Sequence, residues 1–345
     1  METMTQVEVN PSKILQVGMG FFSSKTLLSA VNMQLFTKLA GKQLSGIQIK
    51  EELGLHERGL YDFLDTLVAM GFLRRTGIKE NAVYSNSEDA EIFLDKNKPS
   101  YVGGMLEMSN NRLYHFWNNL EEGLKTGLPQ NESKGGKSGI FEALYADQAQ
   151  LTSFLSAMAG IQMGNFMAFA NGFDFSPYSS HCDMGGAGAH FSTQVVLNNP
   201  HMYSISFDLP PVAPVALNNI KAMGLEDKVG VRSGDFFMDE FPKADVITMG
   251  NVLHDWGTKE KLLLIEKAYR ALPDGGALVV IENIIDDNRS ENVFGLLMSL
   301  NMLIETDEGF DFSAADFDNW AKKVGFRTTE KMSLTGPSSA VIAYK

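Results

Sequence analysis

The chain has 345 residues, 44% of them hydrophobic and 21% charged, and this composition and length are typical of a globular protein with two domains. Its formal net charge of −13 opposes the binding of nucleic-acid phosphates, since the basic clusters Arg74-Arg75 and Lys322-Lys323 are short. The single cysteine, Cys182, excludes an internal disulfide, and no apolar run approaches the roughly 20 residues that span a bilayer.

The first residues, Met1 to Asn10, are polar and acidic, unlike a secretory signal peptide. We therefore expect a cytoplasmic protein that binds neither nucleic acid nor membrane.

Residues 1–100 show the order helix, helix, hairpin that is typical of a winged helix. The predicted helices are Ser24–Leu39, Ser45–Leu53 and Glu57–Met70, and the predicted hairpin pairs residues 72–75 with 82–84. A winged helix serves either DNA binding or dimerisation. Lys and Arg number 11 in this segment and Asp and Glu number 12, so there is no basic excess. We therefore favour a dimerisation domain and a homodimer.

Residues 101–172 are mainly helical and rich in methionine and aromatic residues, and we interpret them as a connector between domains. Gly123 to Gly139 is polar and rich in glycine, which predicts a long surface loop. Phe154 to Ala170 is predicted to be helical again.

Residues 173–345 alternate short apolar strands with helical segments, which predicts an α/β domain with a mostly parallel, Rossmann-like sheet covered by helices on both faces. The predicted strands are 181–184, 203–207, 229–232, 245–249, 277–282 and 340–344. The sequence contains no Gly-x-x-x-x-Gly-Lys-Ser/Thr phosphate loop, which argues against a nucleoside triphosphatase.

Three acidic residues lie at the ends of three successive strands of this domain. Asp183 begins the glycine-rich turn Asp183–Ala189, Asp208 follows the second strand, and Asp235 follows the third. Acids at these positions can accept hydrogen bonds from ribose hydroxyls or from an exocyclic amine. The set favours a nucleoside-containing cofactor. The alternative is that each acid caps the helix that follows it.

His254 follows a buried strand and precedes the helical segment Thr258–Leu272. Open α/β sheets bind ligands at this edge, and histidine takes a proton near neutral pH. His254 is therefore a candidate general base. A structural histidine that caps the following helix fits its position equally well.

Five motifs strengthen the catalytic interpretation. They are Phe207-Asp208-Leu209-Pro210, Gly234-Asp235-Phe236, Leu253-His254-Asp255-Trp256, Ala271-Leu272-Pro273-Asp274-Gly275-Gly276 and Ile281-Glu282-Asn283. Through them, nearly the whole chain resembles the plant-caffeate type of S-adenosylmethionine-dependent O-methyltransferases and their bacterial relatives.

The resemblance implies that Asp208 binds the ribose and that Asp235 and Phe236 hold the adenine of S-adenosylmethionine. It also implies that His254 deprotonates the acceptor hydroxyl, that Glu282 orients His254, and that Asp311 is the second acid. The full set of expected cofactor-binding residues is Asp183, Gly185, Gly186, Asp208, Leu209, Gly234, Asp235, Phe236 and Gly250.

The sequence departs from the family pattern at three places. Ala187 and Ala189 replace glycines of the cofactor turn, where their methyl groups disfavour positive φ unless Gly188 absorbs the turn. Gly250 replaces a basic residue near the adenine. Phe310-Asp311-Phe312 replaces a Glu-Arg-Thr pattern, and the shorter aspartate puts its reach to His254 in question.

We expect an enzyme of secondary metabolism that methylates a small hydroxyl acceptor of aromatic or polyketide-like type. Met158, Met298, Asn301 and Met302 are candidate substrate-binding residues, although the methionines could equally fill the core. No metal is expected, because the adjacent His254 and Asp255 should point apart. Two alternatives stay open: non-methylating chemistry on the same cofactor, and a ligand sensor that binds DNA.

Overall fold

The structure is a computed structural model that describes residues 9–134, 145 and 148–345. The chain divides into two compact units, and the division falls between Tyr114 and His115. The segment expected to be a connector, residues 101–172, is thus shared between the two units. Our three-part division with boundaries at 100 and 172 remains a prediction.

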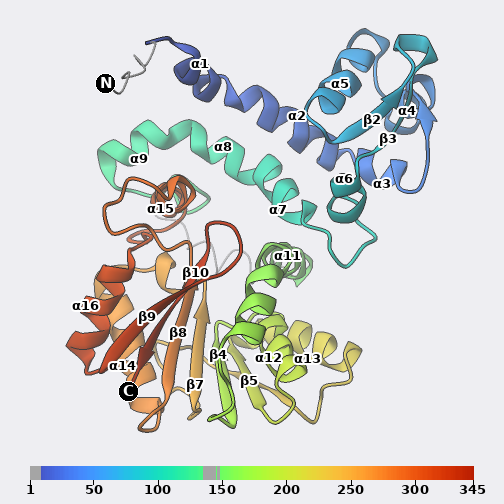
Figure 1. The fold of residues 1–345 in the computed structure, drawn as a ribbon. Coiled ribbons are helices and arrows are strands. Elements are labelled where there is room, and N and C mark those ends of the chain that lie inside the picture. Colours follow the sequence, from blue (N-terminus) through green and yellow to red (C-terminus); the bar gives the residue numbers. More distant parts are fainter. Residues whose placement is uncertain (1–8, 135–144, 146–147) are drawn as a thin grey trace, which may run out of the picture. The chain divides into compact units, whose positions relative to one another are not determined.

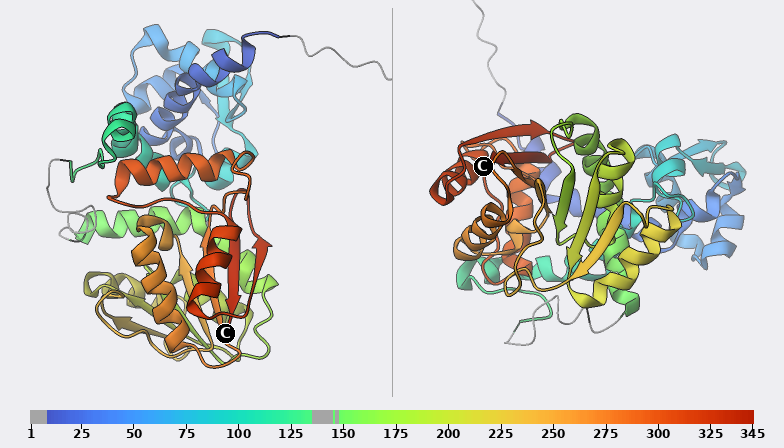
Figure 2. Two further views of the ribbon diagram at one scale, coloured as in Figure 1. Left: turned by 90° about the vertical axis from the view of Figure 1, so that its left-hand side faces the viewer. Right: turned by 90° about the horizontal axis from the view of Figure 1, so that it is seen from below.

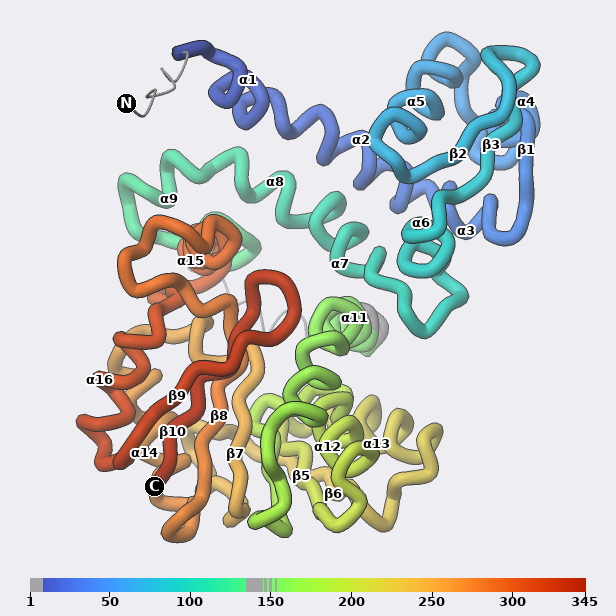
Figure 3. The backbone as a smooth tube through the Cα atoms, in the orientation of Figure 1, coloured from blue at the N-terminus to red at the C-terminus, as the bar shows by residue number. Residues whose placement is uncertain are grey.

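The first unit has the predicted winged-helix order. Its elements are α1 (Ser12–Gly18), α2 (Gly20–Asn32), α3 (Leu35–Leu39), β1 (Leu44–Ser45), α4 (Gly46–Leu53), α5 (Glu57–Ala69), β2 (Leu73–Thr76), β3 (Val83–Asn86), α6 (Glu88–Phe93) and α7 (Gly103–Met108). Figure 3 traces this path. The three strands form an antiparallel sheet in the order β1-β3-β2. Ser45 and Gln48 form a capping box at the start of α4, and Gly54, at φ +66°, ends that helix.

Residues Ser12–Asn32 form a helical stretch that is long and apolar enough, by length and composition only, to cross a membrane. Only 17% of its most apolar window is buried, and Ile14, Val17 and Phe22 are more than half exposed. Lys13, Lys25 and several glycine and serine residues interrupt its apolar residues.

The second unit is the predicted α/β domain (Figures 1 and 2). Its strands are β4 (Ser180–Met184), β5 (Tyr203–Asp208), β6 (Val229–Ser233), β7 (Val246–Gly250), β8 (Ala277–Glu282), β9 (Thr328–Ser333) and β10 (Ser339–Tyr344). Its main helices are α9 (Leu120–Thr126), α11 (Gln148–Gly172), α12 (His190–Asn198), α13 (Ala213–Ala222), α14 (Thr258–Ala271), α15 (Val293–Glu305) and α16 (Ala314–Val324).

The seven strands lie in the order β6-β5-β4-β7-β8-β10-β9. The first five are parallel, whereas β10 is antiparallel to both β8 and β9. The chain order reverses between β4 and β7, and ligands of open α/β sheets bind at such a switch point. All six predicted strands are present.

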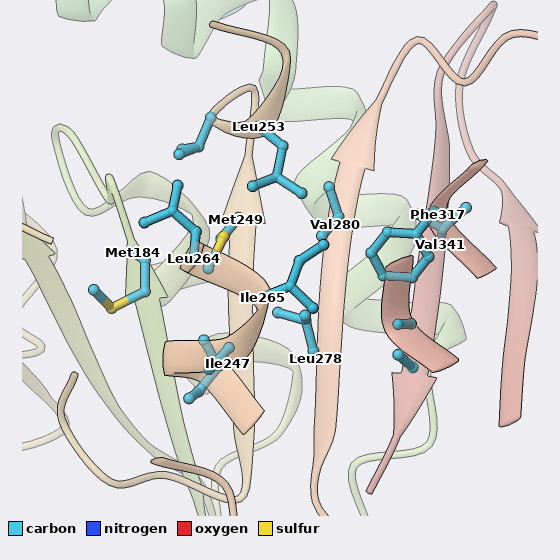
Figure 4. Packing of buried hydrophobic residues seen from close by; sticks show 14 of the residues in the cluster. Met184, Ile247, Met249, Leu253, Leu264, Ile265, Leu278, Val280, Phe317 and Val341 are labelled. Carbon is cyan, nitrogen blue, oxygen red and sulfur yellow. The ribbon is translucent and has the colours of Figure 1, made fainter. Parts of the chain in front are cut away.

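Alternate residues of the strands build the two apolar layers. Leu278 and Val280 of β8 face α14 and α16, as the close view in Figure 4 shows, whereas Val279 and Ile281 face the core below α11, α12 and α13. The same alternation directs Glu282, at the end of β8, toward the α14 side.

The predicted surface loop 123–139 is only partly correct. Residues 123–126 belong to α9, and Gln130 and Asn131 are buried, donating to the carbonyls of Ile304 and Glu305 at the end of α15. Residues 135–139 lie outside the described part of the chain.

Candidate active site

The turn after β4 is held tightly against β5. Gly185 and Gly186 both donate their N–H groups to the carbonyl of Phe207. A Cβ on Gly186 would lie 2.3 Å from Ser206 Oγ and 3.2 Å from Asp183 Oδ2, so the position accepts only glycine. The backbone here can therefore approach a ligand closely, which fits a nucleoside cofactor.

Ala187 and Ala189 adopt the left-handed backbone conformation themselves, with φ of +48° and +60°. Gly188 does not absorb the turn, so each alanine carries strain of about 1 kcal/mol. The two alanines thus keep the left-handed backbone conformation of the turn and carry the strain that glycine would avoid.

Asp183 ends a chain of buried polar side chains. Thr248 Oγ1 donates to Asp183 Oδ1 at 2.6 Å, and the ring of His181 lies between Ser204 Oγ (2.7 Å) and Thr248 Oγ1 (2.9 Å). Because the single Thr248 proton goes to Asp183, the Nε2–H of His181 donates to Thr248, and Ser204 donates to Nδ1. Burial lowers the pKa of His181 to about 3 and raises that of Asp183 to about 7.

Asp208 joins the turn after β4 to the end of β5. Its Oδ2 accepts the N–H of Ala187 at 2.8 Å, and its Oδ1 accepts the N–H of Leu209 at 2.7 Å. Each oxygen keeps a second lone pair for a hydroxyl. Burial raises the pKa of Asp208 to about 6, against the opposing effect of these two N–H groups.

The loop after β6 carries the third acid. Asp235 Oδ1 accepts the N–H of Phe237, and Gly234 donates to the carbonyl of Asp208, which links the second and third loops. Lys267, a buried residue of α14, donates to the carbonyls of Phe236, Phe237 and Asp239.

Gly250 ends β7 beside this arrangement. A Cβ there would make ordinary contact with Phe166, at 3.5 Å.

His254 lies in the short turn η5 (Leu253–Asp255) after β7, and the carboxylate of Glu282 holds this turn. Glu282 Oε1 accepts the N–H groups of Val252 (3.2 Å) and His254 (3.4 Å), while Oε2 lies 3.6 Å from His254 Nδ1. Both side chains are buried.

Asp311 reaches the same nitrogen. Its Oδ1 lies 3.5 Å from His254 Nδ1, and its N–H donates to Ser299 Oγ of α15. The loss of one methylene relative to glutamate therefore does not remove the second acid from the histidine.

One expectation about this cluster is wrong. We expected His254 and Asp255 to point apart, but His254 Nε2 lies 3.6 Å from Asp255 Oδ1. Both residues belong to η5, whose tight turn brings neighbouring side chains together, whereas the expectation assumed extended backbone.

These carboxylates decide the protonation of His254. Burial alone would lower its pKa, but Glu282, Asp255 and Asp311 outweigh this effect and raise the pKa to about 10. Burial also raises the pKa of Glu282, and it raises that of Asp255 to about 6. The cluster thus holds a proton at neutral pH, and His254 is its favoured site.

The spacing of the cluster would also accept a divalent cation, because one ligand atom each from His254, Glu282 and Asp311 lies within 4.8 Å of the others. An imidazolium can satisfy the two carboxylates in the same way, and the absence of a metal here remains a prediction.

The candidate substrate-binding residues lie on two helices. Met298, Asn301 and Met302 belong to α15, which packs against η5, and Asn301 Oδ1 accepts the indole N–H of Trp117 at 2.9 Å. Met158 lies half-buried on α11. Met302 is buried, so it contributes to the core.

Sequence reasoning missed several residues that the structure brings to this edge, namely His181, Thr248, Asp255, Lys261 and Ser299. Asp255 was within the motif that pointed to His254. Lys261 sits among charged residues of an amphipathic segment, where nothing in the pattern distinguishes a buried lysine from an exposed one.

Comparison with known proteins agrees with the geometry. The family model for the O-methyltransferase domain matches residues 117–327, and the model for the O-methyltransferase dimerisation domain matches residues 15–96. The chain belongs to the O-methyltransferase family.

Relatives of this O-methyltransferase align over nearly its whole length. It is 38% identical to the tetracenomycin polyketide synthesis 8-O-methyl transferase TcmO of Streptomyces glaucescens, over 97% of each chain. It is 30% identical to the N,N-dimethyltransferase OxyT of Streptomyces rimosus, covering 92% of this chain and 91% of the relative.

Solved structures share the fold of this O-methyltransferase. Human N-acetylserotonin methyltransferase in complex with SAM matches with a TM-score of 0.88 and 25% identity, over 99% of each chain. NcsB1, in complex with SAM and 2-hydroxy-5-methyl naphthoic acid, matches with a TM-score of 0.76 and 21% identity, over 98% of this chain and 99% of NcsB1. The protein is thus an S-adenosylmethionine-dependent methyltransferase with a dimerisation domain.

Proposed function

We propose that this O-methyltransferase methylates a phenolic hydroxyl of a small, planar, polyketide-like aromatic compound, with His254 as the general base. The observation that carries the proposal is the buried His254, whose Nδ1 lies within 3.6 Å of two buried carboxylates. This arrangement stabilises an imidazolium from the Nδ1 side, so Nε2, which lies 3.6 Å from Asp255 Oδ1, is the nitrogen that would meet an acceptor.

The residues around the switch point hold the cofactor in this proposal. Asp208 accepts the ribose hydroxyls, Asp235 and Phe236 hold the adenine, and Gly185 and Gly186 let the cofactor approach the backbone. Bound S-adenosylmethionine supplies a methyl group on a sulfonium, which needs alignment with the acceptor oxygen and little further activation.

In its neutral form, His254 then takes the proton that the acceptor hydroxyl must lose. The O–H bond breaks, the proton moves to Nε2, and Glu282 and Asp311 stabilise the charge from the Nδ1 side. The nearby carboxylates raise the pKa of His254 and so strengthen its neutral ring as a base. Phenols lose a proton more readily than aliphatic alcohols do, which favours a phenolic acceptor.

The acceptor class rests on the relatives. TcmO is named for polyketide synthesis, and the NcsB1 complex contains a hydroxylated naphthoic acid. An amine acceptor is the second candidate, because OxyT is named as an N,N-dimethyltransferase. A panel of polycyclic phenols, hydroxynaphthoic acids and aromatic amines, with a labelled methyl donor, separates the two. Incorporation into amines alone would contradict the proposal, and acceptor turnover without label would indicate non-methylating chemistry.

Two substitutions test the assigned roles. His254→Ala should lower kcat at least 100-fold and keep cofactor affinity, as expected for loss of a general base. The exposed His115 offers a matched control, and His115→Ala should keep activity. Asp208→Ala should abolish binding of S-adenosylmethionine in calorimetry. Retained turnover in the first variant, or retained affinity in the last, would remove the corresponding role.

We also propose that the first unit forms a homodimer of a cytoplasmic enzyme through its exposed helices α1 and α2. Their apolar side chains fall largely within the segment that matches the dimerisation domain. Sedimentation should give a dimer, and Phe22→Asp should shift it toward monomer. Flotation of the wild-type protein with liposomes would instead assign these helices to a membrane.

A further inference from the structure

Lys261 is a fully buried lysine that the proposed reaction leaves without a role. It lies in the first turn of α14 at 0% exposure, and its Nζ donates to the carbonyl of Trp256. An ammonium group loses most of its hydration at such a place, so it persists only where nearby groups compensate for the loss.

The contacts of Lys261 tie it to both ends of the histidine cluster. Trp256 is two residues from His254, and the Lys261 Nζ lies 3.5 Å from the ring centroid of Phe310 and 5.7 Å from that of Phe312. These two rings flank Asp311 in the sequence. The ammonium is therefore fixed between the turn that carries His254 and the segment that carries Asp311.

The carboxylates of the cluster need a counter-charge. Both oxygens of Asp311 and Oε2 of Glu282 are buried without a hydrogen-bond partner among the described residues. With Asp255 the cluster holds three carboxyl groups against one imidazole, and burying such groups without compensation favours their neutral forms.

The groups that face Lys261 come from four elements. Glu282 comes from β8, Asp255 from η5, Asp311 from the segment before α16, and Glu260 from α14 itself; all four favour its charged form. Burial opposes them and lowers the pKa of Lys261 to about 8, so it is charged at neutral pH.

Two further groups border this cluster. Glu308 lies beside Gly257 together with Glu260, and the phenol of Tyr145, whose pKa is raised by burial and by Asp208 and Asp255, stays neutral.

We propose that Lys261 is a positioning residue whose buried ammonium offsets the charge of the carboxylates around His254, so that the proton of the cluster stays on the His254 ring and not on a carboxyl group. This inference rests on the proposed role of His254 as base. The cation works through the carboxylates and does not touch the acceptor.

The test follows the carboxyl groups of the acceptor-free enzyme by carbon NMR with labelled Asp and Glu side chains. In Lys261→Met, at least one cluster carboxyl should titrate about one pH unit higher than in the wild type. Lys261→Arg should restore the wild-type titration. Lys267→Met is the matched control, since Lys267 is also buried on α14 but donates only to carbonyls; it should leave these titrations unchanged.

Unchanged carboxyl titrations in a folded Lys261→Met variant would overturn the proposal. If that variant does not fold, Asp311→Asn gives the reverse measurement, because loss of this carboxylate should lower the pKa of Lys261 itself, followed by lysine NMR. An unchanged pKa of Lys261 in Asp311→Asn would also overturn the proposal. Neither titration depends on enzyme turnover. If His254→Ala kept full activity, the role of His254 as base would be refuted, but the interaction of Lys261 with the carboxylates could still be measured.

Discussion

Glu282 holds His254 at two points: its Oε1 accepts the backbone N–H of His254 at 3.4 Å, and its Oε2 lies 3.6 Å from the ring Nδ1. The same carboxylate thus fixes both the backbone turn and the charge of the ring. Substitutions can separate these two roles, because an amide keeps the acceptor oxygen and loses the charge.

Glu282→Gln should fold with a Tm close to that of the wild type and lose about 10- to 100-fold in kcat, because it removes a charge that favours the imidazolium. Glu282→Ala should lose as much activity and also 1 to 3 kcal/mol of stability, roughly the cost of unpaired buried N–H groups. Thermal unfolding and kinetics on both variants measure this. Equal stability of the two would show that the bonds to the turn contribute little.

Stability should fall as the pH rises from about 6.5 to 8. The pKa of His254 is raised from 6.5 to about 10, and the pKa of Asp183 is raised from 3.8 to about 7. In this pH range the folded state therefore holds protons that the unfolded state has lost. Each such proton contributes about 1.4 kcal/mol per pH unit where it is fully retained. Glu282, whose pKa is also raised, acts in the same direction.

Chemical unfolding at several pH values checks this slope. His181, whose pKa is lowered, changes the folding stability only below pH 6.5. Lys261, whose pKa is also lowered, makes the stability rise with pH, but only above pH 8. A slope of the opposite sign would mean that the cluster is not protonated in the folded enzyme.

Replacing the strained alanines by glycine should stabilise the cofactor turn. Ala187→Gly and Ala189→Gly relieve the positive φ at each position, and after the entropic cost of glycine the net gain is at most about 0.5 kcal/mol. Ala315→Gly, at an exposed helical position of α16 with ordinary φ, is the control and should lose stability. Calorimetry with S-adenosylmethionine shows whether the relaxed turn also binds more tightly; a loss of stability in both variants would refute the strain.

Thr248→Val should weaken cofactor binding about tenfold, since it removes the charge-assisted hydrogen bond that orients Asp183. The Asp183 pKa should rise further, because the Thr248 bond lowers it. Ser204→Ala, at the far end of the same chain, keeps the bond to Asp183 and should bind the cofactor nearly as the wild type does. Identical affinities of the two variants would remove the orienting role.

Removal of divalent cations should not change activity. Chelation by EDTA, followed by assay with and without added Mg²⁺ or Zn²⁺, tests the prediction that His254, Glu282 and Asp311 hold a proton and not an ion. If chelation abolished activity and only a metal ion restored it, these three residues would be a cation site.

The sequence sufficed for the parts of the fold that repeat a pattern. Buried parallel strands such as β7 and β8 are continuous apolar runs, and all six predicted strands are present. The missed strand, β9, has only exposed and half-buried residues because it lies at the sheet edge, so it carries no apolar signal.

The candidate site was predictable where a residue lies at or just after the carboxyl end of a strand, as Asp183, Asp208, Asp235 and His254 do. Lys261 and Thr248 could not be recognised in this way, since their roles depend on residues far away in the sequence. Thr248 is 65 positions from Asp183, and only the pairing of β4 with β7 brings them together.

The position of β10 has a consequence for the order in which the enzyme is made. This strand lies between β8 and β9 although it follows both in the sequence, and its register pairs Ser339 with Glu282. During synthesis β8 therefore keeps an open edge until residues 339–344 have left the ribosome. Because Glu282 ends that strand, the candidate site around His254 is completed late, after the loops that follow β4 to β7 have already emerged.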